Sequence, residues 1–378
     1  MIVETIKYVF GGSCLARFNG KAIFIPFSLP SEKLEVEIIE NKKDYSKARI
    51  VNILQSSSHR CEPLCKYFYL CGSCNMQMIR YEEQWHLKCS SAVEALSRFD
   101  VSLPLSITSV SDKEWGYRAR FQFHIDKGYP SFMAHSSSKP IVIKNCPIAC
   151  KEINDYLKRK VIFDDILRGS RLHVFAYDGK VYFEGKDKEL LIEILGCKFR
   201  FSPKSFFQSN IKMLEHLVNI LSHHIGECER LLDFYAGVGT FSLFFAKRAK
   251  ELHVVEWNRG SIVDAKFNLE ENMRDSDVKP KCFFYCFSSD KWSKQRASSL
   301  FYDVAIIDPP RSGMDSSSIK WFCEKKVKKI CYVSCDSVTF ARDATILTKQ
   351  GSYRLVALYF LDFYPQTHHV ESLGIFVL

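Results

Sequence analysis

The chain has 378 residues, 47% of them hydrophobic and 25% charged, and a formal net charge of +10. This is the composition of an ordinary globular protein with two or three domains of about 150 residues each. No apolar run reaches the length of a membrane span and residues 1–7 lack the layout of a signal peptide, which argues against a membrane-spanning or secreted protein, so we expect a cytoplasmic one.

Lys and Arg outnumber Asp and Glu by 53 to 43, which suits a polyanionic partner without proving one. The fifteen cysteines are scattered, odd in number and accompanied by no secretion signal, so a disulfide framework is not expected. Cysteines with a role should therefore be metal ligands or nucleophiles.

Residues 1–54 have the pattern of short strands separated by turns, with Asn19-Gly20 as a hairpin signal. The expected strands are Ile6–Phe10, Arg17–Phe18, Ala22–Pro26, Leu34–Ile39 and Ala48–Ile53. Five strands in such a short stretch predict a small barrel. Residues 55–59 look like a linker to the next domain.

Residues 55–200 contain closely spaced cysteines, then a helical pattern over Tyr81–Phe99, and then mostly strands. Cys65, Cys71 and Cys74 lie within ten residues, and Cys146 supplies a distant fourth thiol. Four thiolates suit a 4Fe–4S cluster and equally a tetrahedral zinc ion, and chemistry alone does not choose between them.

From residue 201 to 378, apolar strands alternate with amphipathic helices, which predicts a doubly wound parallel sheet. The expected strands are Arg230–Phe234, Leu252–Val255, Lys281–Phe287, Asp303–Ile307 and Lys329–Ser334. The expected helices are Met213–His223, Thr240–Lys250, Arg259–Asn272, Ser316–Glu324 and Val338–Gln350. Ligands of such sheets bind at the carboxyl ends of the strands.

The first two of these strands end in residues typical of an adenosine site. Gly237 and Gly239 permit a tight turn after the first strand, and Glu256 ends the second, where a carboxylate can accept hydrogen bonds from ribose hydroxyls. Ser242 replaces the third glycine of the pyrophosphate-binding pattern, so a dinucleotide is disfavoured.

The fourth strand ends in Asp308-Pro-Pro-Arg311, which resembles the corresponding loop of class I methyltransferases that use S-adenosylmethionine. Methyltransferases of exocyclic amino groups usually have an aromatic residue at the position of Arg311. RNA cytosine-C5 methyltransferases usually have a cysteine in this loop, which is missing here. We therefore expect neither of these reactions.

Cys335 follows the fifth strand and precedes a helix. A helix N-terminus carries partial positive charge, so we expect this position to lower the pKa of the thiol and prepare it as a nucleophile. A single cysteine is more often only a small buried hydrophobe, and the neighbouring motifs favour the nucleophile.

Five motifs occur together in the order and at the spacing typical of RNA uracil-C5 methyltransferases. They are Ser205-Phe-Phe-Gln-Ser-Asn210, Asp233-Phe-Tyr-Ala-Gly-Val-Gly-Thr240, Asp308-Pro-Pro-Arg311, Tyr332-Val-Ser-Cys335 and Gln366-Thr-His-His-Val-Glu-Ser372. The whole chain resembles the RlmD-like branch of that family. The resemblance implies an α/β plus β architecture: a five-stranded TRAM (OB-like) barrel over 1–54, a mostly β iron–sulfur domain over 55–200, and a Rossmann-like methyltransferase domain over 201–378.

The resemblance also implies roles for single residues. Cys335 would add to C6 of uracil, and Glu371 would remove the proton from C5 after methyl transfer. Without the family, Glu371 would be a surface carboxylate near the last strand. The residues implied to contact S-adenosylmethionine are Gln208, Tyr235, Glu256 and Asp308.

The cysteine spacing matches the family pattern for an iron–sulfur cluster held by Cys65, Cys71, Cys74 and Cys146. Cys61 and Cys150 fall outside that pattern, and we interpret them as structural. Tyr117-Arg-Ala-Arg120 resembles a family segment near the target base, although for Arg120 an exposed strand face is an equally good interpretation.

Two motifs depart from the family. Gly12-Ser-Cys-Leu-Ala16 replaces Gly-x-Gly-x-Ala in the barrel, which puts the local turn and its RNA contacts in question. Ser334-Cys-Asp-Ser337 replaces Ser-Cys-Asn-Pro, and an uncompensated Asp336 would raise the pKa of Cys335.

The sequence thus leads to one main hypothesis, an enzyme that methylates uracil C5 in RNA, with 23S rRNA as the expected substrate and a monomer as the expected form. The alternatives are a tRNA uracil-C5 methyltransferase and a non-catalytic RNA-binding factor of ribosome assembly. Loss of a catalytic residue would favour the second alternative, and none is lost.

Overall fold

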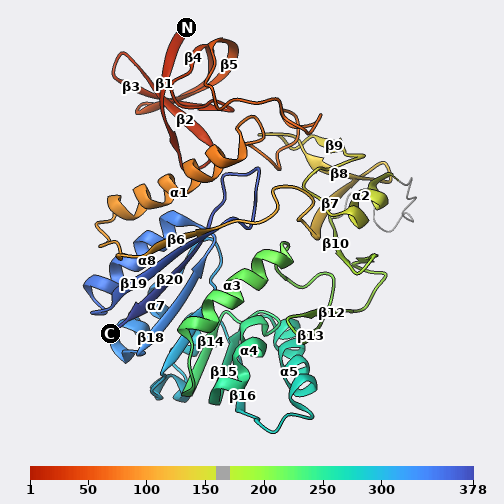
Figure 1. The fold of residues 1–378 in the computed structure, drawn as a ribbon, viewed down its shortest axis with the longest axis vertical. Coiled ribbons are helices and arrows are strands. Elements are labelled where there is room, and N and C mark those ends of the chain that lie inside the picture. Colours follow the sequence, from red (N-terminus) through yellow and green to blue (C-terminus); the bar gives the residue numbers. More distant parts are fainter. Residues whose placement is uncertain (159–170) are drawn as a thin grey trace.

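The computed structural model describes residues 1–158 and 171–378. Figure 1 shows a small barrel at the N-terminal end, a long helix beneath it, and a large twisted sheet that ends near the C-terminus. A second, mostly β region lies beside the barrel and the large sheet.

The N-terminal barrel is closed by five strands in the order β1-β2-β3-β5-β4, which confirms the predicted barrel. Its strands are β1 (Ile2–Val9), β2 (Ser13–Phe18), β3 (Lys21–Pro26), β4 (Lys33–Asn41) and β5 (Tyr45–Gln55). Alternate apolar side chains point inward and form a separate small core that includes Ala16, Ile25 and Leu34.

The middle region begins with helix α1 (Tyr81–Arg98) and strand β6 (Ile107–Val110). A five-stranded sheet follows, in the order β11-β10-β7-β8-β9, with helix α2 (Lys151–Lys158) and a two-stranded β12-β13 ribbon. The strands are β7 (Arg120–Asp126), β8 (Tyr129–Met133), β9 (Pro140–Val142), β10 (Arg171–Tyr177), β11 (Lys180–Phe183), β12 (Leu190–Ile194) and β13 (Cys197–Phe201).

The C-terminal sheet has eight strands in the order β16-β15-β14-β17-β18-β20-β19-β6. They are β14 (Cys228–Phe234), β15 (Ala249–Glu256), β16 (Lys281–Cys286), β17 (Val304–Ile307), β18 (Lys329–Ser334), β19 (Arg354–Leu361) and β20 (Glu371–Val377), with β6 at the edge. Strands β14 to β18 are parallel, as predicted, whereas β20 runs antiparallel between β18 and β19.

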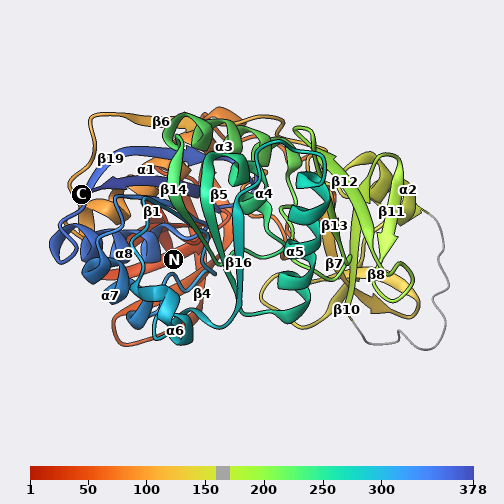
Figure 2. The same ribbon diagram turned by 90° about the horizontal axis from the view of Figure 1, so that it is seen from below.

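Helices cover both faces of this sheet, as Figure 2 shows from below. They are α3 (Ile211–His224), α4 (Thr240–Phe245), α5 (Arg259–Met273), the short α6 (Ser289–Trp292), α7 (Ser316–Lys325) and α8 (Ser337–Lys349). The helix predicted over Thr240–Lys250 is wrong at its end, because Ala249 already pairs with Cys228 as the first residue of β15. Helix α1 joins α7 and α8 in one core.

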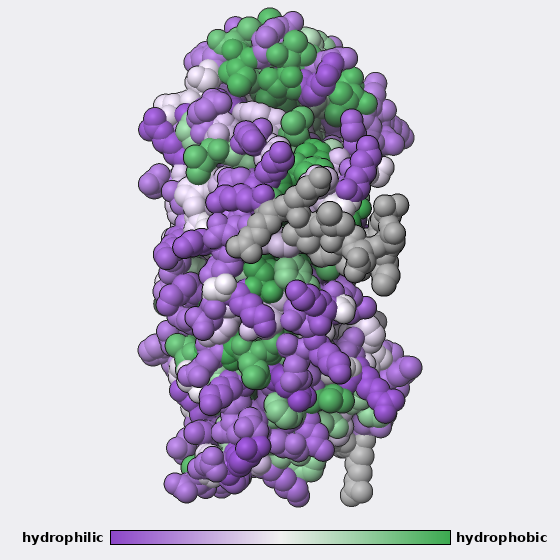
Figure 3. Space-filling model, turned by 90° about the vertical axis from the view of Figure 1, so that its right-hand side faces the viewer, coloured by the Kyte–Doolittle hydropathy of each residue, from purple (hydrophilic) through white to green (hydrophobic). Residues whose placement is uncertain are grey.

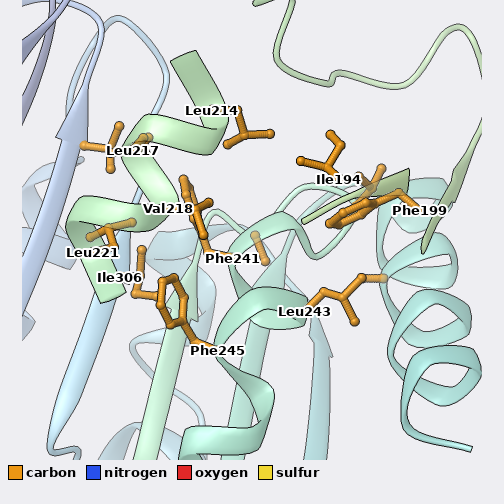
Figure 4. Close-up of a cluster of buried hydrophobic side chains, with 14 of the residues drawn as sticks. Ile194, Phe199, Leu214, Leu217, Val218, Leu221, Phe241, Leu243, Phe245 and Ile306 are labelled. Carbon is orange, nitrogen blue, oxygen red and sulfur yellow. The ribbon is translucent and has the colours of Figure 1, made fainter. Parts of the chain in front are cut away.

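The other face of the sheet is packed mainly by α3, α4 and α5. Figure 4 shows α3 above Phe241 and Phe245 of α4 and Ile306 of strand β17, with Val218 and Leu221 on the side nearest to them. Full burial of such side chains contributes about 1.5–3 kcal/mol each, which fixes α3 and the loop before it against the strand ends. That loop carries Gln208.

The face in Figure 3 is mostly hydrophilic, with apolar side chains gathered at the barrel end. The barrel exposes several large apolar residues, among them Ile2, Ile6, Ile39 and Val51. Within residues 1–158 and 171–378, no helix is long and apolar enough to cross a membrane.

Candidate active site

A cavity of about 930 Å³ opens at the carboxyl ends of β14, β15, β17 and β18. It is the place where a doubly wound sheet binds ligands. All six predicted catalytic and cofactor residues line it: Gln208, Tyr235, Glu256, Asp308, Cys335 and Glu371. Four of them lie in or beside the loops that follow the strands, which explains why sequence position alone could place them together.

The loop after β14 is fixed by hydrogen bonds to carboxylates. Asp233 accepts hydrogen bonds from the Ser242 backbone N–H at 2.7 Å and from its hydroxyl at 2.5 Å. Glu256 accepts from the backbone N–H groups of Gly237 at 2.9 Å and Asn258 at 2.7 Å. Tyr235 has a φ of +68°, a strained value that turns the chain into the cavity wall.

Gln208 is buried, and its Oε1 atom has no hydrogen-bond partner among the described residues. A buried acceptor without a partner is costly, and a ligand donor in the adjoining cavity would satisfy it. Together with the carboxylate of Glu256, this arrangement fits the amino and hydroxyl groups of S-adenosylmethionine.

Cys335 and Glu371 are brought together by the antiparallel pairing of β18 and β20. The last pair in the register is Ser334 with Ser372, so Cys335 and Glu371 come next on opposite strands at the same sheet edge. Both side chains line the cavity. Two residues that are 36 positions apart in the sequence are thus neighbours in the fold, because β18 and β20 are adjacent strands.

Burial raises the pKa of Cys335 to about 12, and the carboxylates of Glu371, Asp308 and Asp336 add to this shift while Arg311 opposes it. The expectation of a pKa lowered by the helix N-terminus is therefore wrong for the protein without ligands. Burial is the main reason for the raised pKa, and at the helix N-terminus the side chain of Asp336 already accepts the N–H groups of Val338 and Thr339.

Asp308, which is half-buried, and Glu371, which is buried, are two neighbouring carboxyl groups of the cavity. Burial raises the pKa of Asp308 to about 7, with a further contribution from Asp233. Burial and the neighbouring Asp308 raise the pKa of Glu371 well above its ordinary value, and Arg311 partly offsets this. A carboxylate with a raised pKa is a stronger proton acceptor, which suits a general base.

Among the cavity residues that were not assigned to the site from sequence are Arg311, Tyr364 and His369. Arg311 donates to Nε2 of His369 at 3.3 Å, and the His369 ring meets that of Tyr364 edge to face. From the sequence, Arg311 indicated only that the chain does not methylate exocyclic amino groups. The position of His369 within the Gln366–Ser372 motif was the available signal, but histidine in a loop is too common to be decisive.

The Tyr117–Arg120 segment approaches the site from the middle region. The hydroxyl of Tyr117 donates to the backbone oxygen of Pro365 at 2.9 Å. The guanidinium of Arg120 lies 5.7 Å from the ring centre of Phe206, a cavity residue. Arg120 is thus half-buried against the rim of the cavity and does not lie on a free strand face.

The four predicted ligand cysteines lie in the middle region, and some of their thiols affect one another electrostatically. Burial raises the pKa of Cys74 to about 12, and the thiols of Cys146 and Cys71 contribute. Burial likewise raises the pKa of Cys146 to about 12, with contributions from Cys65 and Cys71. Neither Cys61 nor Cys150 is perturbed by another cysteine; the raised pKa of each has burial as its largest cause.

Within the described parts of the chain, no three His, Cys, Asp or Glu side chains are arranged to hold one metal ion.

Comparison with known families gives two matches. Residues 176–279 and 287–378 match the family described as tRNA (Uracil-5-)-methyltransferase. Residues 2–51 match the TRAM domain.

Similar proteins extend over the whole chain. An uncharacterized RNA methyltransferase of Treponema denticola is 40% identical, over 99% of this chain and 98% of its own. The 23S rRNA (uracil(1939)-C(5))-methyltransferase RlmD of Shewanella sediminis is 30% identical, over 100% and 95%. The fold resembles that of a Pyrococcus abyssi tRNA (uracil-54, C5)-methyltransferase in complex with S-adenosyl-L-homocysteine, with a TM-score of 0.76, 23% identity and 99% coverage of both chains.

Proposed function

Because the chain belongs to the tRNA (uracil-5-)-methyltransferase family, we propose that it methylates C5 of a uridine in 23S rRNA, acting as a monomer. Membership in the family makes it an RNA uracil-C5 methyltransferase that uses S-adenosylmethionine. The observation that carries the proposed mechanism is the convergence of Cys335 and Glu371 on one cavity. The 23S rRNA target is supported by the full-length similarity to the RlmD protein.

The proposed cofactor contacts are Gln208, Tyr235, Glu256 and Asp308. Glu256 is held in place by two backbone N–H groups and can accept from ribose hydroxyls, while Gln208 Oε1 offers an unpaired acceptor. S-adenosylmethionine supplies an activated methyl group on a positively charged sulfur. Both residues serve to orient that group toward the strand ends.

In the proposed reaction, Cys335 acts as the nucleophile. Its thiol gives its proton to solvent, and the sulfur then forms a bond to C6 of uracil, so that the electrons of the C5–C6 double bond make C5 nucleophilic. C5 would then take the methyl group as the bond from that group to the donor sulfur breaks, and S-adenosylhomocysteine would leave. Arg311 supports this step because its positive charge favours the thiolate. The thiolate is the reactive form, so its formation in the cavity is a condition for turnover.

Glu371 completes the reaction as the general base. It accepts the C5 proton, the electrons of the C5–H bond re-form the C5–C6 double bond, and the bond from sulfur to C6 breaks. The raised pKa of Glu371 strengthens it as a proton acceptor, and its place opposite Cys335 puts it beside the same ring. Free Cys335 and 5-methyluridine result.

We also propose that Cys65, Cys71, Cys74 and Cys146 hold a 4Fe–4S cluster, with zinc as the alternative. The mutual effect of these thiols on one another and the exclusion of Cys61 and Cys150 support the assignment. The cluster would stabilise the region over 55–200, between a barrel over 1–54 that contacts RNA and a methyltransferase domain over 201–378. No step of the reaction requires it to change redox state.

The proposal is tested by mass spectrometry of nucleosides after reaction of the purified protein with S-adenosylmethionine and RNA from a strain that lacks the gene. The wild type should form 5-methyluridine in 23S rRNA and none in tRNA. Cys335→Ala should abolish the product. Cys228→Ala, at the opposite end of the sheet, should not.

Glu371→Gln separates the two proposed roles. This variant can form the bond to C6 but cannot remove the C5 proton, so a covalent protein–RNA complex should accumulate on denaturing gels. Cys335→Ala should form no such complex. Formation of 5-methyluridine at the normal rate by Cys335→Ala would refute the mechanism. Formation of 5-methyluridine in tRNA alone would refute the proposal that 23S rRNA is the substrate.

A further inference from the structure

The loop between β19 and β20, residues 362–370, leads directly into Glu371 and carries the cavity residues Tyr364 and His369. Its position therefore decides how the proposed base is aimed. The loop has no regular structure of its own that could fix it, so contacts from elsewhere must do so. These contacts come from α1, from the cysteine-rich segment and from the barrel, and also from Tyr117 and Asn210, which donate to the backbone oxygens of Pro365 and Phe363.

Gln366 is the most constrained residue of this loop. It is buried and has a φ of +69°, a conformation that costs a non-glycine residue energy and persists only when its surroundings enforce it. Gln84 of α1 exchanges two hydrogen bonds with Gln366, at 2.9 and 3.2 Å. The backbone oxygen of Gln366 accepts the N–H groups of Asn75 and Met76 at 3.2 and 3.1 Å.

Asn75 also bonds to His368 with both ends of its amide. Its Nδ2 lies 2.8 Å from Nδ1 of His368, and its Oδ1 accepts the His368 backbone N–H at 2.9 Å. Burial lowers the pKa of His368 to about 4, so the ring is neutral and Nδ1 can accept. Asn75 directly follows Cys74 in sequence, so the contact ties the cysteine group to the loop.

The barrel also contacts Asn75 and His368. Gly12, in the turn between β1 and β2, has a φ of +88°, and a Cβ atom there would lie 1.9 Å from Nδ2 of Asn75. Phe10 packs edge to face on His368, with ring centres 6.0 Å apart. Asn75 thus lies between the turn of the barrel and the 362–370 loop, and contacts on both sides restrict its side chain.

We propose that Asn75 is a positioning residue for methyl transfer: its paired hydrogen bonds with His368 hold the 362–370 loop so that Glu371 faces Cys335. This inference rests on the proposed function for its kinetic consequence, but its structural part stands without it. Loss of the Asn75 side chain should loosen the loop and displace Glu371. It should leave the residues proposed to contact S-adenosylmethionine unchanged, because they lie on other strand ends.

The test compares Asn75→Ala with Asn272→Ala, which removes an amide on α5 that also makes two hydrogen bonds, with the backbone N–H and oxygen of Lys198 at 2.8 and 2.7 Å, away from the cavity. In the holoprotein without RNA, hydrogen exchange of the backbone amides of residues 366–371 should be faster in Asn75→Ala only. The kcat should fall by between about 10- and 100-fold, the range expected for displacement of a catalytic group by about 1 Å, with the KM for S-adenosylmethionine unchanged. Asn75→Asp, whose carboxylate can accept from the other tautomer of His368, should recover part of the rate.

His368→Ala removes the side-chain contact with Asn75 from the loop side. This variant replaces Asn75→Ala in the test if Asn75→Ala does not fold. It should accelerate exchange in the same amides, and the double variant should add little to either single one. Wild-type exchange and kcat in both variants would overturn the proposal. A wild-type protein that methylates no uridine would instead refute the proposed function, while the exchange comparison would still decide whether Asn75 holds the loop.

Discussion

Lys88 and Asp362 form a buried ion pair at the start of the loop over residues 362–370. We expect the removal of this pair to lower the free energy of unfolding. Both side chains are 0% exposed, and Nζ and Oδ1 are 2.5 Å apart. Lys88 also donates to the backbone oxygen of Tyr364 at 3.1 Å, and the Tyr81 hydroxyl donates to Asp362 at 2.9 Å. Replacement of Lys88 by Met leaves a buried carboxylate with the tyrosine as its remaining side-chain donor.

The structure gives the magnitude through burial. Loss of one partner of a fully buried ion pair costs about 3–5 kcal/mol, because the other charge is left buried without its partner. We therefore expect Lys88→Met to lower the free energy of unfolding by about 3–5 kcal/mol at pH 7.

Urea unfolding followed by circular dichroism measures this difference. Lys7→Met is the matched control, since Lys7 and Glu94 are also 2.5 Å apart but are 43% and 33% exposed. An exposed pair contributes about 0–1 kcal/mol, so this variant should be nearly as stable as the wild type. The double variant Lys88→Met/Asp362→Leu should regain most of the loss. A Lys88→Met protein as stable as Lys7→Met would refute the reasoning.

Two further predictions concern the cavity. Because the pKa values of Glu371 and Cys335 are raised, the base and the nucleophile are protonated at low pH, so kcat/KM for RNA should rise with pH. Stopped assays from pH 6 to 9 check this, and a rate that falls over this range would contradict it. Gln208→Ala should weaken binding of S-adenosylhomocysteine by about tenfold in calorimetry, because a buried hydrogen bond to the ligand is lost. Gln295→Ala, outside the cavity, is its control, and equal affinity in both variants would show that Gln208 does not contact the ligand.

Local patterns were enough to predict most of the strands and helices around the site. The Lys329–Ser334 strand and the helix after it are present nearly as expected, because apolar periodicity and the Asp336 cap are local signals. The common placement of Gln208, Glu256 and Asp308 followed from their proximity to strand ends, a rule that needs only the strand assignment.

What the sequence did not reveal depends on contacts between distant segments. The sign of the pKa shift at Cys335 is set by burial and by carboxylates that only the folded chain brings near it. The network of Asn75, Gln366 and His368 joins segments nearly 300 positions apart and leaves no periodic trace. The pairing of β6 with β19 is equally hidden, since a four-residue strand carries no pattern that names its partner.

That edge pairing has a consequence for how the chain matures. Residues 107–110 leave the ribosome roughly 250 residues before their partner strand, so the strand must wait unpaired while most of the polypeptide is made. Helix α1, just upstream, likewise awaits α8 to bury its apolar face. The catalytic sheet can thus be completed only after β19 has been made, and nascent chains depend until then on protection of an unpaired strand and an uncovered helix.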